Sequence, residues 1–237
     1  NANAALVNRI IRNLTQQKHL AAHTIRLYLS SLRHFCHQAM REGILKDTSW
    51  QMVEMPQVLH HHFSLTKAEL SMLEQYSLEG TKAHVRDLFL FASKTGLAYA
   101  DLRALRPQHI ERGESEGWLT IYRKKTHQRA LIYLSNSVLQ LLDHLPKHAS
   151  MVEGWIIVPD NRTINRHLHQ LGQTLHLSEP LHLHVARHTF ATLLLQSGIS
   201  VETVSTMLGH AHISTTQRYA EVTKQKIIQE LGKDKER

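Results

Sequence analysis

The chain has 237 residues, of which 42% are hydrophobic and 20% are charged, and its formal net charge is +8. This composition excludes a disordered chain, and the absence of a long apolar run excludes a membrane-spanning helix. The single cysteine, Cys36, excludes an internal disulfide, and the positive charge favours a polyanionic partner such as nucleic acid. The first residues lack a signal-peptide pattern, so we expect a cytoplasmic protein.

The first part of the chain is predicted to be helical. Ala4 to Lys18 is one candidate helix, and Thr24 to Arg41 is a second. Arg26 and Arg33 lie on one face of the second helix, and solvation is the ordinary explanation of such a face. Its other face has apolar residues at helical spacing, which we expect in the core: Ile25, Tyr28, Leu32, Phe35, Cys36, Ala39 and Met40.

Residues 54–64 contain Pro56 and show no periodicity, so we interpret them as a linker between two domains. Three adjacent histidines, 60–62, lie in this segment. No further His or Cys pair stands at zinc spacing nearby, so no metal site is predicted. Thr66 and Glu69 then form a capping box that opens the next helix.

The second part of the chain changes from helix to strand and back. Lys124 and Lys125 lie near the turn of a predicted hairpin. The fold is therefore expected to be mainly α-helical with a small antiparallel β-sheet. Its predicted elements are helices over 81–94, 98–105 and 135–145, a hairpin of WLTIY (118–122) and ALIYL (130–134), and helices from residue 161 onward.

Three helices are predicted near the C-terminus. The first carries His184 and Arg187, which project from one side because they are three residues apart. The second ends just before His210. The third opens with the capping box S-x-x-Q at 214–217 and bears Tyr219.

An arginine, two histidines and a tyrosine together meet the needs of phosphoryl transfer through a covalent phosphotyrosine. The phosphodiester gains negative charge in the transition state, and an arginine fork can hold two of its oxygens. A histidine can donate a hydrogen bond or accept the nucleophile's proton, and a tyrosine needs a base or a positive charge to become nucleophilic. A hairpin lysine such as Lys125 can protonate the departing alkoxide. Taken singly, each residue has an ordinary structural explanation, and their order and spacing favour the chemistry.

In these motifs the sequence resembles the tyrosine recombinase (phage integrase) family. That family has H-x-x-R, then LGH, then a tyrosine nine residues on. The chain has HVAR (184–187), LGH (208–210) and TTQRY (215–219). The stretch TGLAYADLRAL (95–105) resembles the family's T-G-x-R-x-x-E/D-L box, and KKT (124–126) resembles the segment with its hairpin lysine.

The resemblance implies a role for each matching residue. Tyr219 would attack the scissile phosphate to give a 3′-phosphotyrosyl link and a free 5′-hydroxyl, and Arg187 would stabilise the phosphate. His184 would support proton transfer or phosphate binding, and His210 would bond a phosphate oxygen. Lys125 would act as the general acid. No metal or other cofactor is implied, because the covalent link conserves the phosphodiester energy.

One position departs from the family's pattern. The arginine of the first box falls at Ala98, whose methyl group cannot bind phosphate, whereas Asp101 matches the acidic position and would brace the site. Some branches of the family on mobile elements resemble TGLAYxD and also lack this arginine. We hypothesise that Lys94 or Arg129, each close in sequence to an element of the site, supplies the missing charge.

We therefore expect a two-lobed DNA strand-exchange enzyme. A helical core-binding domain would cover 1–53 and a tyrosine recombinase catalytic domain would cover 65–237. Residues 20–43 are similar to the last part of the family's core-binding domain, and because about two helices fit where the family has about four, we expect this domain to be N-terminally truncated. Double-stranded DNA with specific core sites is the expected partner, with phosphate contacts from Arg26, Arg33, Arg123 and Lys124.

The expected assembly is a homotetramer on DNA, as in the family, and the expected role is integration or excision of a mobile element. A catalytically silent DNA-binding relative, acting as a regulator, is the alternative that Ala98 favours. A metal-dependent hydrolase built on the histidines is a third alternative, but it lacks a ligand cluster with paired carboxylates. We expect the C-terminal tail to dock on a neighbouring protomer through Val222, Ile227, Ile228 and Leu231.

Overall fold

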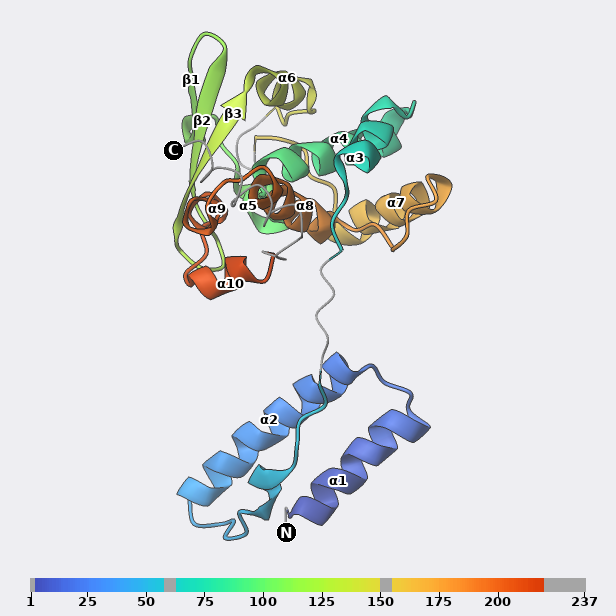
Figure 1. Cartoon of the computed structure of the whole chain (residues 1–237), viewed down its shortest axis with the longest axis vertical. Coiled ribbons are helices and arrows are strands. Elements are labelled where there is room, and N and C mark those ends of the chain that lie inside the picture. Colours follow the sequence, from blue (N-terminus) through green and yellow to red (C-terminus); the bar gives the residue numbers. More distant parts are fainter. Residues whose placement is uncertain (1–2, 58–62, 150–154, 220–237) are drawn as a thin grey trace, which may run out of the picture. The chain divides into compact units, whose positions relative to one another are not determined.

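The computed structural model describes residues 3–57, 63–149 and 155–219. The chain divides into two compact units, residues 1–61 and 62–237, and Figure 1 shows the elements of each. The tail residues that we expect to dock on a neighbour lie outside the described residues.

The first unit is a small helical bundle with a core of its own. Helix α1 spans Ala4–Arg12 and continues as a π-helical segment over Asn13–Gln17, and helix α2 spans Ala22–Arg41. A 3₁₀ turn at Ser49–Met52 brings Trp50 against them, because the indole is 1% exposed. The buried apolar side chains of this core are Val7, Ile25, Leu29, Cys36, Trp50 and Val53.

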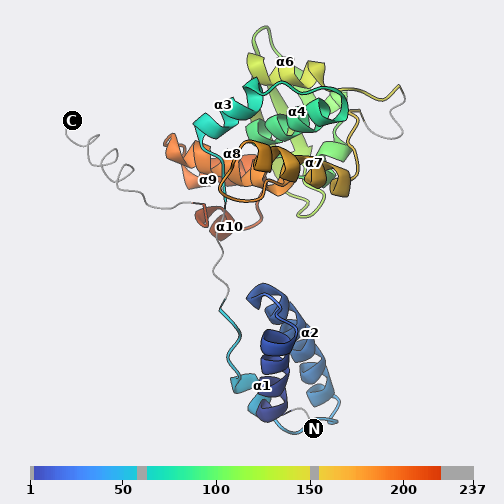
Figure 2. The same ribbon diagram turned by 90° about the vertical axis from the view of Figure 1, so that its right-hand side faces the viewer.

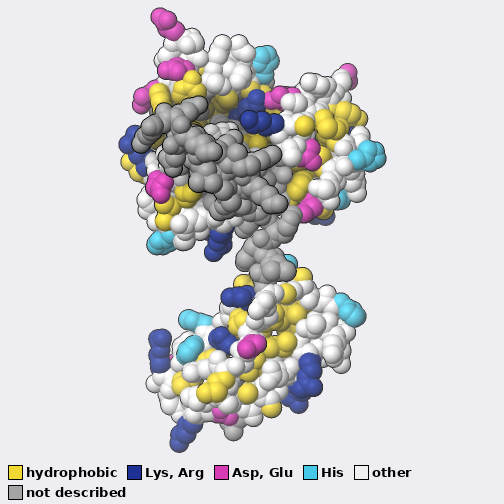
Figure 3. Space-filling view, in the orientation of Figure 1, with side chains coloured by type: hydrophobic (Ala, Val, Ile, Leu, Met, Phe, Trp, Pro, Cys, Tyr) yellow, Lys and Arg dark blue, Asp and Glu magenta, His cyan; other side chains and the backbone are white. Residues whose placement is uncertain are grey.

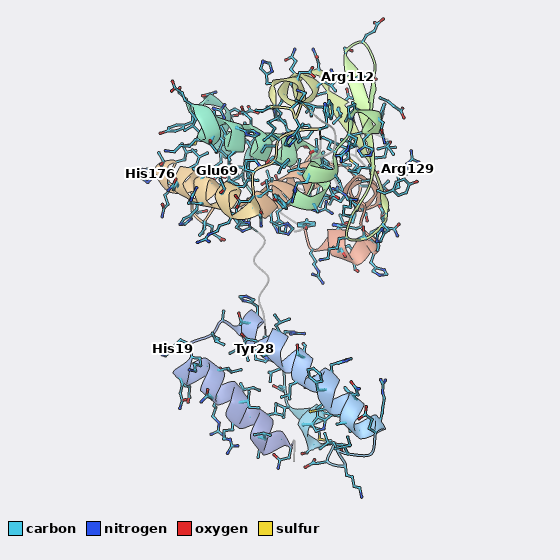
Figure 4. The ribbon with its side chains drawn as sticks, turned by 180° about the vertical axis from the view of Figure 1, so that it is seen from behind. His19, Tyr28, Glu69, Arg112, Arg129 and His176 are labelled. Carbon is cyan, nitrogen blue, oxygen red and sulfur yellow. The ribbon has the colours of Figure 1, made fainter. Side chains whose placement is uncertain are left out.

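The buried face of α2 differs from the predicted one. Tyr28 and Phe35, which we expected in the core, are 54% and 65% exposed, whereas Leu29 is 2% exposed. Figure 4 labels Tyr28 on this helix. The prediction was wrong for these two aromatics, because α2 packs on α1 and the Trp50 segment along a narrower stripe that runs through Ile25, Leu29 and Cys36.

The second unit is mainly helical with a three-stranded antiparallel sheet, as predicted, and Figure 2 shows it turned by 90°. Among the described helices of the chain, none is long and apolar enough to span a membrane. The helices are α3 (Lys67–Gln75), α4 (Gly80–Thr95), α5 (Tyr99–Ala104), α6 (Asn136–His144), α7 (Asn161–Thr174), α8 (Leu183–Gln196), α9 (Val201–Leu208) and α10 (Ile213–Gln217).

The sheet has the strand order β1-β2-β3. Strands β2 (Glu116–Tyr122) and β3 (Arg129–Ser135) form the predicted hairpin, with Trp118 opposite Tyr133 and Tyr122 opposite Arg129. The sequence did not predict β1 (Ile110–Arg112), which is three residues long and therefore too short to show an alternating pattern. The side chains of β2 and β3 alternate between a buried face and an exposed face, so one face of the sheet packs on the helices.

Helix α4 lies in the middle of the second unit, in contact with α3, α6, α7 and α8 (Figures 1 and 2). Its second half is almost fully buried, as expected for a central helix. It ends at Gly96, whose φ of +66° is left-handed. A Cβ at this position would lie 2.6 Å from Cδ1 of Phe190, so glycine is required both for the backbone and for close packing on α8.

The two helix ends near the predicted tyrosine were predicted with unequal success. Helix α9 ends at the left-handed Gly209, as expected. Helix α10, however, begins two residues earlier than predicted, with His212 and not Ser214 as its N-cap, so the capping box at 214–217 is wrong. Its first turn closes through the backbone, where Thr215 N donates to the carbonyl of His212. Tyr219 lies just beyond the C-cap of α10, not within the helix.

The buried stripe of α2 predicts different effects for neighbouring apolar residues. Leu29→Ala should lower the free energy of unfolding of the first unit by about 2–4 kcal/mol, because it leaves a cavity in a small core. Phe35→Ala is the matched control and should change it by less than about 0.5 kcal/mol. Denaturant unfolding followed by Trp50 fluorescence, with Trp118 and Trp155 replaced by Phe, measures both. Equal losses would contradict the observed face.

Candidate active site

Arg187 is the buried centre of the candidate site. It lies on α8, and its side chain is held between two chain segments that are distant in sequence. Nη1 donates to the carbonyl of Gly96 at 2.7 Å, and Nη2 donates to the carbonyl of Leu208 at 2.8 Å. A guanidinium has five N–H bonds, so among the described residues three of those of Arg187 remain for a phosphate.

Arg123 is a second buried guanidinium on the same carbonyls. It follows directly after β2 and is 3% exposed. Its Nε donates to the Leu208 carbonyl at 2.8 Å, and its Nη2 donates to the Gly96 carbonyl at 3.3 Å. Nη2 also donates to the carbonyl of Met207 at 3.4 Å. The two arginines therefore converge on one place from a hairpin and a helix.

The shared carbonyls belong to two helix ends. Gly96 is the C-cap of α4, and Leu208 is the last residue of α9. The last carbonyls of a helix have no partner within the helix and carry the negative end of its dipole, so they favour cations. Gly209 also makes room for Arg123, since a Cβ there would lie 2.7 Å from Cγ of Arg123.

Asp101 neutralises one of the two buried charges. It is 3% exposed on α5, and its Oδ2 accepts from Nη1 of Arg123 at 2.8 Å. Oδ2 also accepts from the backbone N–H of Ala98 at 3.4 Å, and Oδ1 accepts from the backbone N–H of Lys124 at 3.1 Å. Asp101 thus joins α5 to the hairpin. This position is consistent with a bracing role, and the site keeps one net positive charge.

Tyr219 lies among three histidines. Its ring is 6.4 Å from that of His210, nearly parallel at 14°, and 5.2 Å from that of His188. His188 in turn packs edge-on against His184 with centroids 4.4 Å apart. His210 is fixed by a 2.7 Å hydrogen bond between its Nδ1 and Oγ1 of the buried Thr216. The structure thus gathers His184, His210 and Tyr219 at one place through His188.

The electrostatics of the site follow from burial beside two arginines. Burial, and next the charge of Arg123, lower the pKa of Arg187 to about 10. Burial, and then the charges of Arg187 and Arg123, lower the pKa of His210 to about 4, so this imidazole is neutral at neutral pH. Burial raises the pKa of Tyr219, while the Arg187 charge acts in the opposite direction.

The hairpin turn carrying Lys125 is anchored to the same site. Oγ1 of Thr126 donates to the carbonyl of Gly209 at 3.0 Å, and the Lys125 side chain next to it is exposed. Lys124 is also exposed. The lysine therefore lies on a short, exposed turn whose next residue contacts the segment that carries His210.

The remaining predicted residues lie in the first unit. Arg26 is exposed and donates to the carbonyl of Pro56 at 3.5 Å, whereas Arg33 donates to the carbonyls of Gln51 and Val53. On the face in Figure 3, Lys and Arg side chains of this unit surround a group of hydrophobic ones. Among the described residues of the whole chain, no group of three or more His, Cys, Asp or Glu side chains could hold a metal ion.

Sequence reasoning missed three members of this site. Arg123 was placed among DNA phosphate contacts, yet it is buried beside Arg187. His188 and Thr216 were not singled out at all. A signal existed for Arg123, since it lies between a predicted strand and the hairpin lysines. Arg123 is buried by contacts with Asp101 and with two helix ends that are distant in the sequence, and no local pattern predicts such contacts.

Comparison with known proteins decides the family. The phage integrase family matches residues 64–226, which is more than half of the chain. The chain belongs to the phage integrase family. Tyrosine recombinase XerC of Chromohalobacter salexigens is 30% identical over 211 residues, covering 84% of this chain and 70% of that protein. Tyrosine recombinase XerC of Pediococcus pentosaceus is 27% identical over 236 residues, covering 91% and 77%.

A solved integrase has the same fold. The Tn1549 transposon integrase, in complex with a circular intermediate DNA, superposes with a TM-score of 0.77 at 17% identity. The match covers 98% of this chain and 85% of that one. The mainly helical catalytic fold with a small sheet is thus the fold of a phage integrase family member.

The depressed pKa of His210 predicts a loss of stability in acid. The unfolded chain takes up this proton near pH 6.5, whereas the folded chain resists it until about pH 4, so the free energy of unfolding should fall as the pH drops through this window. His210→Gln should make the fall shallower, and His169→Gln, at an exposed histidine, should not. Denaturant unfolding at several pH values measures this. Identical pH curves for the three proteins would refute the environment assigned to His210.

Proposed function

We propose that this chain is a site-specific DNA recombinase that cuts and rejoins strands through a 3′-phosphotyrosyl intermediate. The observation that carries the proposal is the buried Arg187, of which three N–H bonds have no acceptor among the described residues, in a site that also holds Tyr219 between His188 and His210. A buried net positive charge with fixed donors is prepared for a phosphate before the reaction begins.

The reaction transfers one phosphoryl group, first to Tyr219 and then to a 5′-hydroxyl. Oη of Tyr219 attacks phosphorus and loses its proton, the bond from phosphorus to the 5′ oxygen breaks, and that oxygen takes a proton to leave as a 5′-hydroxyl. The tyrosine remains linked to the 3′ phosphate. A 5′-hydroxyl from another strand then attacks the same phosphorus and releases Tyr219 with its proton. The number of phosphoester bonds is unchanged, so the cycle consumes no ATP.

Each residue of the site has a role in that cycle. Arg187 holds nonbridging oxygens of the phosphate with its remaining N–H bonds. His210, neutral and fixed by Thr216, hydrogen-bonds another oxygen. His184 supports proton transfer near the nucleophile. Lys125, at the exposed hairpin turn, protonates the leaving 5′ oxygen.

The relatives support the DNA partner and the biological role. The relatives named tyrosine recombinases and the Tn1549 integrase bound to a circular intermediate DNA favour a substrate of double-stranded DNA with core sites, acted on in the cytoplasm. They also favour integration or excision of a mobile element. We further propose that a homotetramer acts on the DNA, with the tail, outside the described residues, docked on a neighbour.

The first unit supplies further DNA contacts in this proposal. Residues 1–53 form the core-binding domain, followed by a linker at 54–64 and the catalytic domain at 65–237. Arg26 and Lys124 are exposed, so their side chains can reach phosphates, and the hydrogen bond that Arg26 donates to the carbonyl of Pro56 is long at 3.5 Å. Arg33 already donates to two backbone carbonyls, so its contribution is weaker.

Loss of the Tyr219 hydroxyl should abolish covalent capture of DNA. The probe is a pool of half-site duplexes with randomised sequence, each carrying the bond to be cut near one end, so that the short fragment leaves and the adduct accumulates. The chain should form adducts that survive denaturing electrophoresis, in the presence of EDTA, and Tyr219→Phe should form none. Sequencing the trapped DNA then gives the selected half-site.

The same assay separates the proposal from its alternative. A regulator that binds DNA without chemistry would enrich a sequence by binding and leave no adduct. Adducts in the Tyr219→Phe variant, or none in the parent chain on sequences that it binds, would contradict the recombinase proposal.

Lys125→Ala should slow cleavage of the selected half-site by about 100-fold or more, because the leaving oxygen lacks its acid. Replacing the 5′ bridging oxygen by sulfur should restore most of the rate, because a thiolate leaves without a proton. Lys82→Ala, which removes one exposed charge from α4, is the control. The rate of adduct formation measures all three. A Lys125→Ala defect that persists with the sulfur substrate would assign the lysine another role.

A further inference from the structure

We propose that Arg123, which directly follows β2, supplies the second positive charge at the scissile phosphate. Its guanidinium lies beside Ala98. This inference rests on the recombinase activity proposed above. The missing arginine at Ala98 is then not a loss of positive charge from the site, because Arg123 supplies that charge from another element.

The position of the Arg123 head group carries the inference. Nη1 of Arg123 donates to Oδ2 of Asp101, and the same oxygen accepts from the backbone N–H of Ala98. The guanidinium of Arg123 therefore lies beside the first turn of α5, where one carboxylate, that of Asp101, bonds both to it and to the backbone of Ala98. It also shares the carbonyls of Gly96 and Leu208 with Arg187, so the two cations lie side by side.

Other cations near this box are engaged elsewhere. Nζ of Lys94 lies 2.6 Å from Oε1 of Glu74, in a partly exposed ion pair between α4 and α3. Arg103 lies over the ring of Tyr99. Arg129 is exposed on the hairpin, where Figure 4 labels it at the edge of the unit. Among the described residues, neither Lys94 nor Arg129, our two sequence-based hypotheses, forms a hydrogen bond or an ion pair with Asp101 or with the two carbonyls that hold Arg187.

Stability alone is a poor explanation for this arrangement. Two guanidinium groups repel each other at short range, and a buried ion pair such as Arg123 with Asp101 is often no more stable than an apolar pair of the same size. Burial lowers the pKa of Arg187 most, and the charge of Arg123 lowers it further. An anion that enters beside both arginines relieves this repulsion, so the arrangement favours a bound phosphate over the empty site.

The two arginines differ in how many N–H bonds they have left for a phosphate. Four N–H bonds of Arg123 go to Asp101, Gly96, Met207 and Leu208, which leaves one, whereas Arg187 keeps three among the described residues. Arg187 is thus the ligand of the phosphate oxygens. Arg123 acts as a positioning residue, which fixes a second charge next to Arg187 and anchors the hairpin end.

The test removes the Arg123 guanidinium together with the Asp101 carboxylate that pairs with it, so the cation beside Arg187 is lost and no carboxylate is left buried without a partner. Arg123→Gln alone leaves Asp101 buried without its partner and risks unfolding, so the main variant is the double substitution Arg123→Gln with Asp101→Asn. Thermal unfolding checks that it folds. Cleavage of the selected half-site is then compared with cleavage of the same duplex carrying a methylphosphonate at the scissile position, which has lost one negative charge.

The ratio of the two cleavage rates separates charge from structure. For the double variant, cleavage of the phosphodiester should fall by about 100-fold or more, while cleavage of the methylphosphonate should stay within about tenfold of the parent chain. Arg129→Gln, on the same hairpin, should leave the ratio unchanged. A damaged site would slow both substrates alike, and such parallel loss, or full activity of the double variant, would overturn the role of Arg123.

A second, independent test restores a positive charge at position 98, where the family's first box has its arginine. Ala98 is only half-buried, and Ala98→Arg in the double variant should recover at least about tenfold of the lost phosphodiester rate. No recovery, together with an unchanged rate ratio, would contradict the inference but leave the recombinase proposal intact. Absence of any adduct with the parent chain would overturn both.

Discussion

Two carbonyl oxygens, those of Gly96 and Leu208, each accept hydrogen bonds from two buried arginines, and the rest of the site depends on this sharing. The carbonyls are available because α4 and α9 both end there, each closed by a glycine in the left-handed conformation. The arginines come from α8 and from the end of β2. Four elements far apart in sequence therefore meet through four hydrogen bonds.

The same contacts explain why the chemistry-bearing residues lie close together. Asp101 ties Arg123 and the backbone of Lys124 to α5, and Thr126 ties the hairpin turn to Gly209. His210 follows Gly209 directly, and its bond to Thr216 orients the short segment that leads to Tyr219. The proposed nucleophile, an imidazole and a hairpin lysine are thus connected to one buried cationic centre, which is an arrangement fitted to a phosphodiester.

Local patterns predicted most of the helices and the hairpin, because apolar periodicity and helix-ending glycines can be recognised within short stretches of sequence. They placed α9 and Gly209 correctly, but they misplaced the start of α10, whose first turn is closed by a backbone bond from Thr215 to His212. The face of α2 was also misjudged at Tyr28 and Phe35, since which apolar residues are buried depends on the partner helix. Motif spacing led to Arg187, His184, His210 and Tyr219, whereas the burial of Arg123 depends on Asp101 and two helix ends that no local pattern connects.

The central claim is that the buried arginine pair is built to receive the scissile phosphate, and the most direct measurement is a crystal structure of Tyr219→Phe with its selected half-site. The account predicts nonbridging phosphate oxygens at about 2.7–2.9 Å from N–H groups of Arg187, with Arg123 still bound to Asp101 beside them. A scissile phosphate held away from both guanidinium groups, with the Arg187 and Arg123 contacts to Gly96 and Leu208 unchanged, would contradict it.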